Sequence, residues 1–253
     1  MVGKLFSNLA KRRMPSQNRH HIDWMASKHG LGPKLFASTD DGILMEWLED
    51  ESLNATTVHG SVEWIARVAP RLVAFHYMET PDPPNVLWES MNVMMMMMQD
   101  ASLVERQVSR QRASIEPLDL PTVLGHGDLK PSNIIGEKIP RFIDLEISGM
   151  HYRGFDLAKL FRTDHPTYMS EDNLKLFLEH YLRSSPILVN SDKELDLLRL
   201  ETKIMEPLTV SIVYYSNTLT VSVSFVRHSQ PSFTPVARSG RFLCLFSVLG
   251  PRE

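Results

Sequence analysis

The segment between residues 124 and 146 constrains the fold of this chain more than any other part of the sequence. Residues 124–135 read L-G-H-G-D-L-K-P-S-N-I-I and, after a G-E-K turn, residues 141–146 read R-F-I-D-L-E. Two short apolar runs that are separated by a turn predict a β-hairpin. Polar residues precede the first run and follow the second, so we expect them to meet at one end of the hairpin.

The spacing in this segment, H-G-D-x-x-x-x-N followed by I-D-x-E, is typical of phosphoryl transfer. That reaction needs positioning and charge neutralisation more than covalent chemistry. Asp128 would orient the attacking hydroxyl and take its proton, while Asn133 and Asp144 would give Mg²⁺ hard oxygen ligands. His126 would support the loop through hydrogen bonds. The alternative is a polar hairpin whose Asp and Asn only form turns, but four matched positions between two apolar strands favour a phosphotransferase.

The composition describes an ordinary globular chain and excludes several classes of partner. The 253 residues are 43% apolar and 23% charged, with a net charge of −3, so we expect neither nucleic acid nor an anionic membrane as partner. The single cysteine, Cys244, excludes an intramolecular disulfide and favours a reducing, cytoplasmic location. The uncharged stretch 208–226 is rich in Ser, Thr, Tyr and Asn, a poor composition for a membrane span.

Apolar periodicity, β-branched content and turn residues predict the secondary structure of the remaining chain. We expect helices over 18–29, 63–77 (kinked at Pro70), 88–112, 172–183 and 192–205. We expect strands over 2–7, 34–39 and 42–49, with the last two joined at an Asp40-Asp-Gly turn. Further strands are predicted for 209–215 and 218–226.

Three blocks of the sequence resemble the choline/ethanolamine kinases, which belong to the aminoglycoside phosphotransferase-like superfamily. Residues 126–133 and 142–158 resemble the H-N-D-L-x-x-x-N loop and the F-I-D-x-E-Y-x-G-x-N-Y-x-x-x-D-I-A run of that family. Residues 29–49 resemble its H-G-L-G-P-x-L-Y…E-F-I-E region, and residues 74–81 resemble a helix end that carries x-L-H…P. The resemblance covers about residues 1–206.

The resemblance implies an α+β, protein-kinase-like fold with two lobes. We expect a truncated, antiparallel N-lobe over residues 1–50, a mostly helical C-lobe with the catalytic hairpin over 51–207, and a divergent, partly disordered tail over 208–253. We therefore expect this sequence to lack the loop with which such kinases cover the phosphates. The tail has no tryptophan, whereas the family's C-terminal helices use tryptophans to wall the amino-alcohol pocket.

The resemblance also assigns an ATP site. Lys4 would contact the α- and β-phosphates, and Glu46, Trp47 and Leu48 would form the hinge whose backbone contacts adenine. A lone lysine near a terminus is otherwise simply solvated. The sequence offers no acid before Asp23 to pair with Lys4.

The substrate side of the site rests on fewer residues. Glu146 would be a second metal ligand or a contact for the substrate ammonium, the alternative being a surface carboxylate. Tyr152 would form an aromatic wall against the substrate cation, the alternative being an ordinary half-buried tyrosine. Asp156 would support the catalytic loop, and Arg153 would be solvated or ion-paired.

These assignments together predict a kinase that uses ATP and Mg²⁺ to phosphorylate the hydroxyl of choline or ethanolamine, the first step of phospholipid head-group synthesis. One alternative is a catalytically impaired pseudokinase or regulatory fragment. Another is a related kinase for a different small hydroxylated substrate. The chain could act as a homodimer or as one subunit of a heterodimer.

Overall fold

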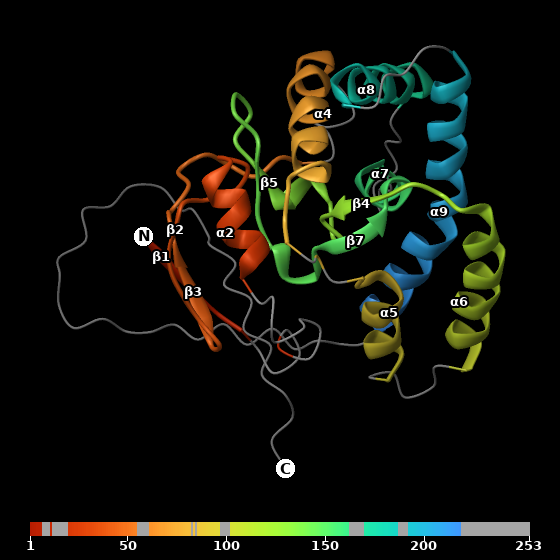
Figure 1. Ribbon diagram of the computed structural model, residues 1–253, viewed down its shortest axis with the longest axis horizontal. Helices are drawn as coiled ribbons and strands as arrows, with labels where there is room; N and C mark the ends of the chain where they lie inside the picture. The colour runs from red at the N-terminus through yellow and green to blue at the C-terminus, as the bar shows by residue number, and fades with distance from the viewer. Residues whose placement is uncertain are drawn as a thin grey trace.

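The computed structural model describes residues 1–6, 11, 20–54, 61–81, 83, 85–96, 102–161, 170–186 and 192–218. Figure 1 shows a small sheet with one helix beside a larger, mostly helical part that contains two further pairs of strands. The described chain is therefore α+β.

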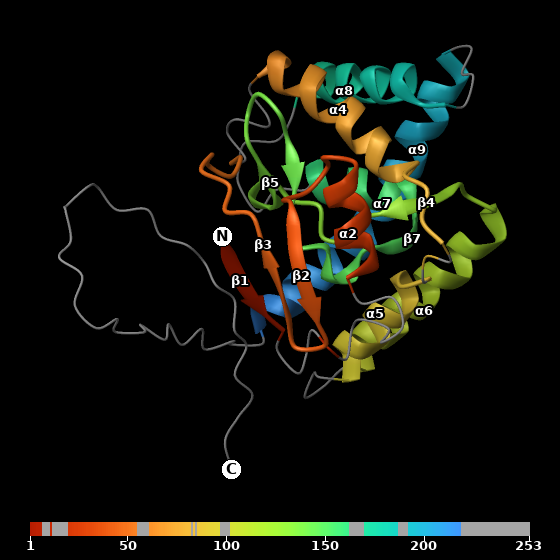
Figure 2. The ribbon, with the colours of Figure 1, turned by 60° about the vertical axis from the view of Figure 1, so that its left-hand side comes forward.

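The N-terminal part is a three-stranded antiparallel sheet. Its strands β1 (Val2–Leu5), β2 (Leu35–Thr39) and β3 (Gly42–Met45) lie in the order β1-β3-β2. Helix α2 (His21–Lys28) lies beside this sheet (Figures 1 and 2). The predicted hairpin of strands is confirmed, although β3 ends four residues before the predicted end at residue 49.

The predicted catalytic hairpin lies between the sheet and the helices. Strand β5 (Ile134–Ile135) pairs with β6 (Arg141–Phe142), and the pair is antiparallel, as the sequence predicts. A second antiparallel pair joins β4 (Thr122–Gly125) to β7 (Gly149–Tyr152). The short helices η2 (Pro131–Asn133) and η3 (Leu145–Ile147) connect the two pairs. The polar residues of the motif therefore lie where the chain passes between the β4–β7 pair and the β5–β6 pair.

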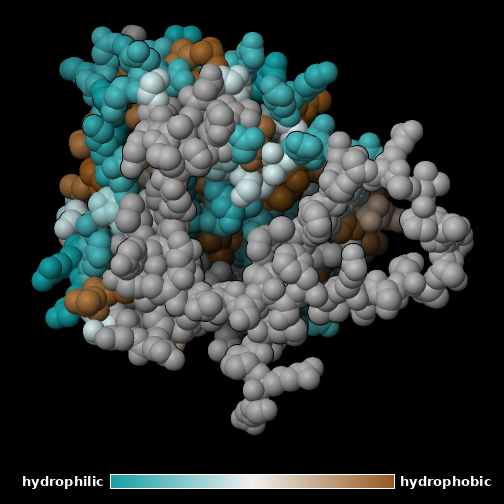
Figure 3. Space-filling model, turned by 180° about the vertical axis from the view of Figure 1, so that it is seen from behind, coloured by the Kyte–Doolittle hydropathy of each residue, from teal (hydrophilic) through white to brown (hydrophobic). Residues whose placement is uncertain are grey.

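Helices cover the C-terminal part. They are α4 (Val62–His76), α5 (Leu87–Met96), α6 (Ser102–Ile115), η1 (Glu116–Leu118), α7 (Arg153–Phe161), α8 (Glu171–Ser184) and α9 (Asp192–Thr218). Helices α4 and α8 pack side by side at the top of the molecule, and α7 packs on α9 (Figure 1). From behind, the described surface at the top is mainly hydrophilic, as expected for amphipathic helices (Figure 3). The sequence predicted one helix over 88–112, where the structure has both α5 and α6.

Helix α9 corrects the strand prediction for residues 209–215, because the helix continues to Thr218. Met205, Leu208 and Thr209 are at most 1% exposed, and the first two belong to an apolar cluster with Phe155 of α7. This packing outweighs the weak strand preference of β-branched residues. The predicted strand at 218–226 lies outside the described residues, except for Thr218, which is helical.

Arg153 is buried, and its guanidinium forms two hydrogen bonds of 2.6 and 2.7 Å with the carboxylate of Glu201 on α9. It is thus ion-paired rather than solvated. In the part of the chain that the structure describes, no helix is both long and apolar enough to span a membrane.

Candidate active site

Asp128 lies in the loop after β4, and the buried ring of His126 fixes that loop. Nε2 of His126 lies 3.0 Å from the carbonyl oxygen of Ile143, and its Nδ1 lies 3.3 Å from the backbone nitrogen of Asp128. Since the carbonyl can only accept and the backbone N–H can only donate, Nε2 carries the proton and Nδ1 accepts. Burial lowers the pKa of His126, which favours this neutral ring.

Asp156 of α7 holds the same loop through its backbone. Its carboxylate accepts hydrogen bonds from the backbone nitrogens of His126 at 2.6 Å and Gly127 at 2.9 Å, and Nε2 of His76 lies 3.1 Å away. Burial alone would raise the pKa of Asp156, but the hydrogen bond and charge of His76, with the other nearby imidazoles, lower it to about 2. Gly127 has a φ of +80°, and a Cβ there would lie 2.4 Å from the carbonyl oxygen of Ile147. Only glycine fits this position without a shift of the backbone.

Two lysines hold the carboxylate of Asp128. Nζ of Lys159 lies 2.5 Å from Oδ1, and Nζ of Lys130 lies 2.9 Å from Oδ2. Lys159 has a side chain that is 6% exposed, whereas that of Lys130 is 45% exposed. Burial would raise the pKa of Asp128, but the two ammonium groups outweigh it and keep the pKa well below its usual range. Asp128 is therefore ionised at neutral pH.

Asn133 connects the loop to the strand that leads to Asp144. Its Nδ2 donates to the carbonyl oxygen of Asp128 at 2.9 Å, and its own carbonyl accepts from the backbone nitrogen of Ile143 at 3.0 Å. Because Nδ2 is directed at Asp128, Oδ1 is the end of the amide that can bind a cation.

Lys4 reaches the hairpin from β1. Its Nζ contacts Oδ1 of Asp144 and lies 2.6 Å from Oε1 of Glu146. Burial alone would lower the pKa of Lys4, but the two carboxylates raise it to about 12. Lys4 thus lies inside the candidate site rather than in solvent.

Asp23 of α2 is the first acid after Lys4 in the sequence, and it responds to the charge of Lys4. Removal from water raises the pKa of Asp23 to about 6, the charge of Lys4 opposes this rise, and the charges of Glu146 and Asp144 add to it. The carboxyl of Asp23 therefore lies close enough to this cluster to respond to its charges.

Asn133, Asp144 and Glu146 fit the requirements of Mg²⁺. They offer only oxygen donors, and the ammonium of Lys4 already occupies a cation position on both carboxylates. Among the described residues, no group of three or more His, Cys, Asp and Glu could hold a metal. Two carboxylates and one amide are nevertheless sufficient for Mg²⁺, which keeps several waters and binds substrate phosphates.

The predicted hinge follows β3. Oε2 of Glu46 accepts hydrogen bonds from the backbone nitrogen of Lys34 and from Nη1 of Arg141, both at 3.1 Å. The indole of Trp47 is 39% exposed, and Leu48 is buried. The side chain of Glu46 is thus engaged with β6, and a contact with adenine through the backbone of these residues stays a prediction.

Tyr152 is the last residue of β7, and its described contacts are aromatic and apolar. Its ring packs edge-on against Trp88 with the centroids 6.4 Å apart, and the guanidinium of Arg112 lies 5.4 Å from the Trp88 ring. Tyr152 also packs against the apolar cluster formed by α5, α6 and α9. Its predicted role as a wall for a substrate cation stays a prediction.

Contacts of the described chain link Asp128, Asn133 and His126 in one loop, and Lys4, Asp144 and Glu146 in an adjoining cluster. The sequence predictions missed Lys159, which is three residues after Asp156 and therefore on the same face of α7. That spacing was the available signal. They named Asp23 as the first acid after Lys4 but assigned it no role beside Lys4.

Comparison with known proteins identifies the family of this fold. A sequence profile of the choline/ethanolamine kinases matches residues 12–215. The chain belongs to the choline/ethanolamine kinase family. It is 23% identical over 194 residues to ethanolamine kinase 2 of Rattus norvegicus, covering 67% of this chain and 50% of that protein. It is 26% identical over 203 residues to probable choline kinase 1 of Arabidopsis thaliana, covering 68% and 57% of the two chains. The chain thus spans about half the length of these relatives.

Solved structures agree on the fold. An ethanolamine kinase from Plasmodium vivax superposes with a TM-score of 0.63 at 17% identity, covering 79% of this chain and 65% of the other. A choline kinase from Streptococcus pneumoniae superposes with a TM-score of 0.61 at 20% identity, covering 85% and 78%. The fold of this family member is therefore α+β and protein-kinase-like, as the sequence predicts.

Proposed function

We propose that this chain transfers the γ-phosphoryl group of ATP to the hydroxyl of choline or ethanolamine. The observation that carries the proposal is the position of Asp128, an ionised carboxylate held beside Asn133 in a loop that His126 and Asp156 fix. Membership of the family supports ATP as phosphoryl donor and an amino alcohol as acceptor.

In this proposal, Asp128 accepts a hydrogen bond from the acceptor hydroxyl and takes its proton as the oxygen attacks phosphorus. Lys159 keeps Oδ1 in place. Oδ2, which contacts the half-exposed Lys130 at 2.9 Å and Nδ2 of Asn133 at 3.4 Å, is the oxygen that would face the acceptor. A base with a lowered pKa takes the proton late, which suits a loose transition state. Tyr152 and Glu146 are the proposed contacts for the substrate cation.

Asn133, Asp144 and Glu146 would hold Mg²⁺, which would neutralise charge on the β- and γ-phosphate oxygens. Lys4, whose ammonium contacts both carboxylates here, would then contact the α- and β-phosphates instead. Glu46, Trp47 and Leu48 are the proposed backbone contacts for adenine.

The test is turnover of ATP by the purified chain with Mg²⁺ and either choline or ethanolamine. We expect turnover that depends on one of these acceptors, and Asp128→Ala should reduce it by roughly 10²–10⁴-fold, the usual contribution of a general base. The exposed Asp196→Ala on α9 serves as a matched control. Turnover that Asp128→Ala leaves unchanged would reject Asp128 as the base.

A second candidate function is a regulatory fragment without catalysis. Both oxygens of Asp128 and both carboxylates of the predicted metal site contact lysines, so lysine ammonium groups already occupy the positions that substrate and metal would need. A folded chain that neither binds Mg–ATP nor turns it over would support this candidate. A cytoplasmic location and association into a homodimer or heterodimer remain part of the proposal.

A further inference from the structure

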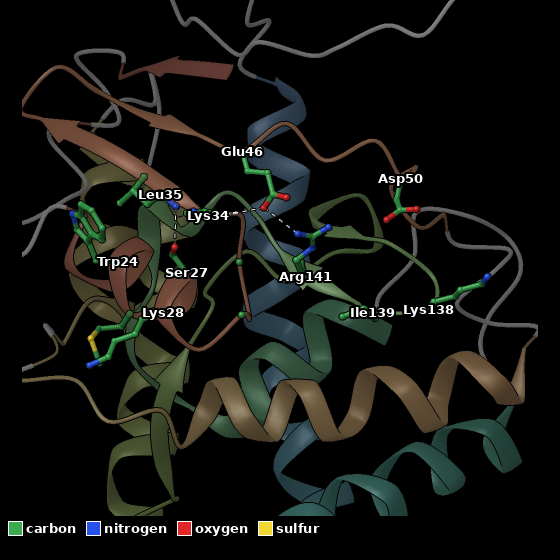
Figure 4. Close-up of a pocket in the computed structure, with 13 residues that line it drawn as sticks. Trp24, Ser27, Lys28, Lys34, Leu35, Glu46, Asp50, Lys138, Ile139 and Arg141 are labelled. Carbon is green, nitrogen blue, oxygen red and sulfur yellow. Dashed lines mark hydrogen bonds and ion pairs between the residues drawn. The ribbon is translucent and has the colours of Figure 1, made fainter. Parts of the chain in front are cut away.

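A second concave site lies away from the residues that we propose for catalysis. Its cavity has a volume of about 900 Å³ and is formed by α2, the start of β2, the segment after β3 and the turn between β5 and β6 (Figure 4). Of the proposed site residues, only Glu46 lines it. Small-molecule pockets typically have volumes of about 300–1,000 Å³, so this cavity can hold a compound of ordinary size.

The charges around this cavity favour an anion. Four basic residues and two acidic residues, Glu46 and Asp50, line it. Glu46 is already paired with Arg141 at 3.1 Å. Among the described residues, no carboxylate lies within ion-pair distance of Lys28 or Lys138. A concave surface with unpaired cations and low-dielectric walls concentrates the positive potential.

Arg141 provides a fixed cation in the middle of this site (Figure 4). Its Nε is buried and has no hydrogen-bond partner among the described residues. Nε of Arg71 donates to the carbonyl oxygen of Pro140 at 2.9 Å, and burial together with the nearby charge of Arg141 lowers the pKa of Arg71. A bound carboxylate or phosphate would stabilise two neighbouring guanidinium groups, because its negative charge offsets the repulsion between them.

One end of the cavity combines apolar side chains with Lys28 (Figure 4). Trp24 and Leu35 line it there, and the indole of Trp24 is 44% exposed while its Nε1 donates to Oγ of Ser38 at 3.2 Å. Ile139 adds an exposed apolar side chain on the side of the turn. An aromatic face of this kind binds a flat apolar group.

We propose that this cavity binds a small organic anion whose flat apolar part lies against Trp24 and whose carboxylate or phosphate group contacts Arg141. Such an occupant would touch α2, the predicted hinge and the β5–β6 turn together. The proposal concerns a binding site that is separate from the phosphoryl-transfer site, and it does not depend on the reaction.

The test is calorimetric titration of the full chain with 1-naphthoate as the probe, with 1-naphthalenemethanol as its neutral analogue. We expect saturable binding of one naphthoate per chain, weaker in high salt, and at least tenfold weaker binding of the neutral alcohol. The double variant Lys28→Glu/Lys138→Glu should weaken naphthoate binding at least tenfold. Both side chains are exposed, so the variant is expected to fold, which circular dichroism checks.

The matched control is Lys175→Glu/Lys203→Glu, which makes the same change of net charge at exposed positions of α8 and α9. An equal loss of binding in the control would overturn the proposal, as would equal affinity for the neutral alcohol or the absence of saturable binding. Displacement of naphthoate by Mg–ATP in direct competition would also overturn it, because the probe would then occupy the nucleotide site.

Discussion

A buried lysine holds the side chain that we propose as the catalytic base. Lys159 lies three residues after Asp156 on α7, so one helical face fixes both the backbone and the carboxylate of the Asp128 loop. A buried ammonium is costly unless it is paired, and Asp128 provides the pairing. The orientation of Asp128 therefore depends on how α7 packs.

We expect Lys159→Met to lower kcat by roughly 10- to 100-fold, because a misplacement of about 1 Å in a reacting group can cost about 10² in rate. The KM for ATP should change little, since Lys159 contacts Asp128 and not the predicted nucleotide residues. Lys130→Met is the matched control, and its half-exposed side chain should matter less for kcat. Steady-state kinetics of both variants, with equal thermal stability checked first, provide the measurement. A larger effect on kcat in the Lys130 variant would reverse the roles given to the two lysines.

At the residue scale, the sequence predicted the parts of the site that are local and missed the parts that depend on packing. Asp128, Asn133 and Asp144 belong to one continuous hairpin, so their spacing indicates that they meet. Lys159 reaches Asp128 across 31 positions, and Asp23 approaches Lys4 only because α2 lies beside the sheet. The local spacing places Lys159 on the same face of α7 as Asp156, but no local pattern brings Lys159 to Asp128 or Asp23 near Lys4.

At the scale of the elements, helices α7 and α9 pack closely at Gly154. A Cβ at Gly154 would lie 2.7 Å from the backbone of Glu201, and Arg153 next to it forms the buried ion pair with the same residue. Gly154→Ala should lower the free energy of unfolding by about 1–3 kcal/mol, the usual cost of overpacking. Gly3→Ala is the control, because nothing lies within 4 Å of its added Cβ. Urea denaturation compares the two, and a stabilised Gly154→Ala would show that the helices separate without cost.

The carboxylate of Asp156 connects α7 to His76 of α4 and to the loop after β4. Because this carboxylate titrates, its contribution to stability depends on pH. The pKa of Asp156 is lowered from 3.8 to about 2 in the folded chain, so folding favours its ionised form. Its contribution is complete above the unfolded pKa and is lost as the pH falls from about 4 towards 2. Asp156→Asn should cost about 1–3 kcal/mol at pH 7, because an amide leaves one of the backbone donors unsatisfied.

The measurement is urea denaturation of the wild type and of Asp156→Asn between pH 7 and pH 3. The difference between them should stay constant above about pH 5 and shrink below about pH 4. Asp196→Asn, at an exposed position of α9, should show no such difference at any pH. A gap that widens on acidification would contradict the assigned direction of the pKa shift.

The sequence predicted helices and strands correctly where the periodicity of apolar residues was strong. Helices α4 and α8 and the two hairpins follow from apolar spacing and turn residues, whereas α9 was cut short. Its last turns contain Thr, Val and Ile, which alone favour strands, but Leu208 and Thr209 are buried as part of the helix. Burial against α7 is a tertiary effect and is not visible in the local sequence.

At the scale of the whole molecule, charged contacts join the N-terminal sheet to the helical part. Lys4 of β1 binds Asp144 and Glu146, and Glu46 after β3 binds Arg141 of β6. Phe142 also donates its backbone N–H to the carbonyl oxygen of Leu31 at 2.7 Å. The sheet is thus attached to the hairpin at the same residues that we propose for Mg²⁺ and phosphate.

Lys4 and Mg²⁺ should therefore compete for the same two carboxylates. In Lys4→Met, Asp144 and Glu146 lose their cation, so the variant should be less stable than the wild type without metal and should bind Mg²⁺ more tightly. At a hundredfold excess over its Kd, a ligand stabilises the folded state by about 2.7 kcal/mol. Added MgCl₂ should consequently raise the Tm of the variant more than that of the wild type, with NaCl of equal ionic strength as the reference.

The double variant Lys4→Met/Asp144→Asn removes one carboxylate and should lose this additional shift. Equal Mg²⁺ shifts in the wild type and in Lys4→Met would mean that Asp144 and Glu146 hold Lys4 for structural reasons only, and that the metal site lies elsewhere.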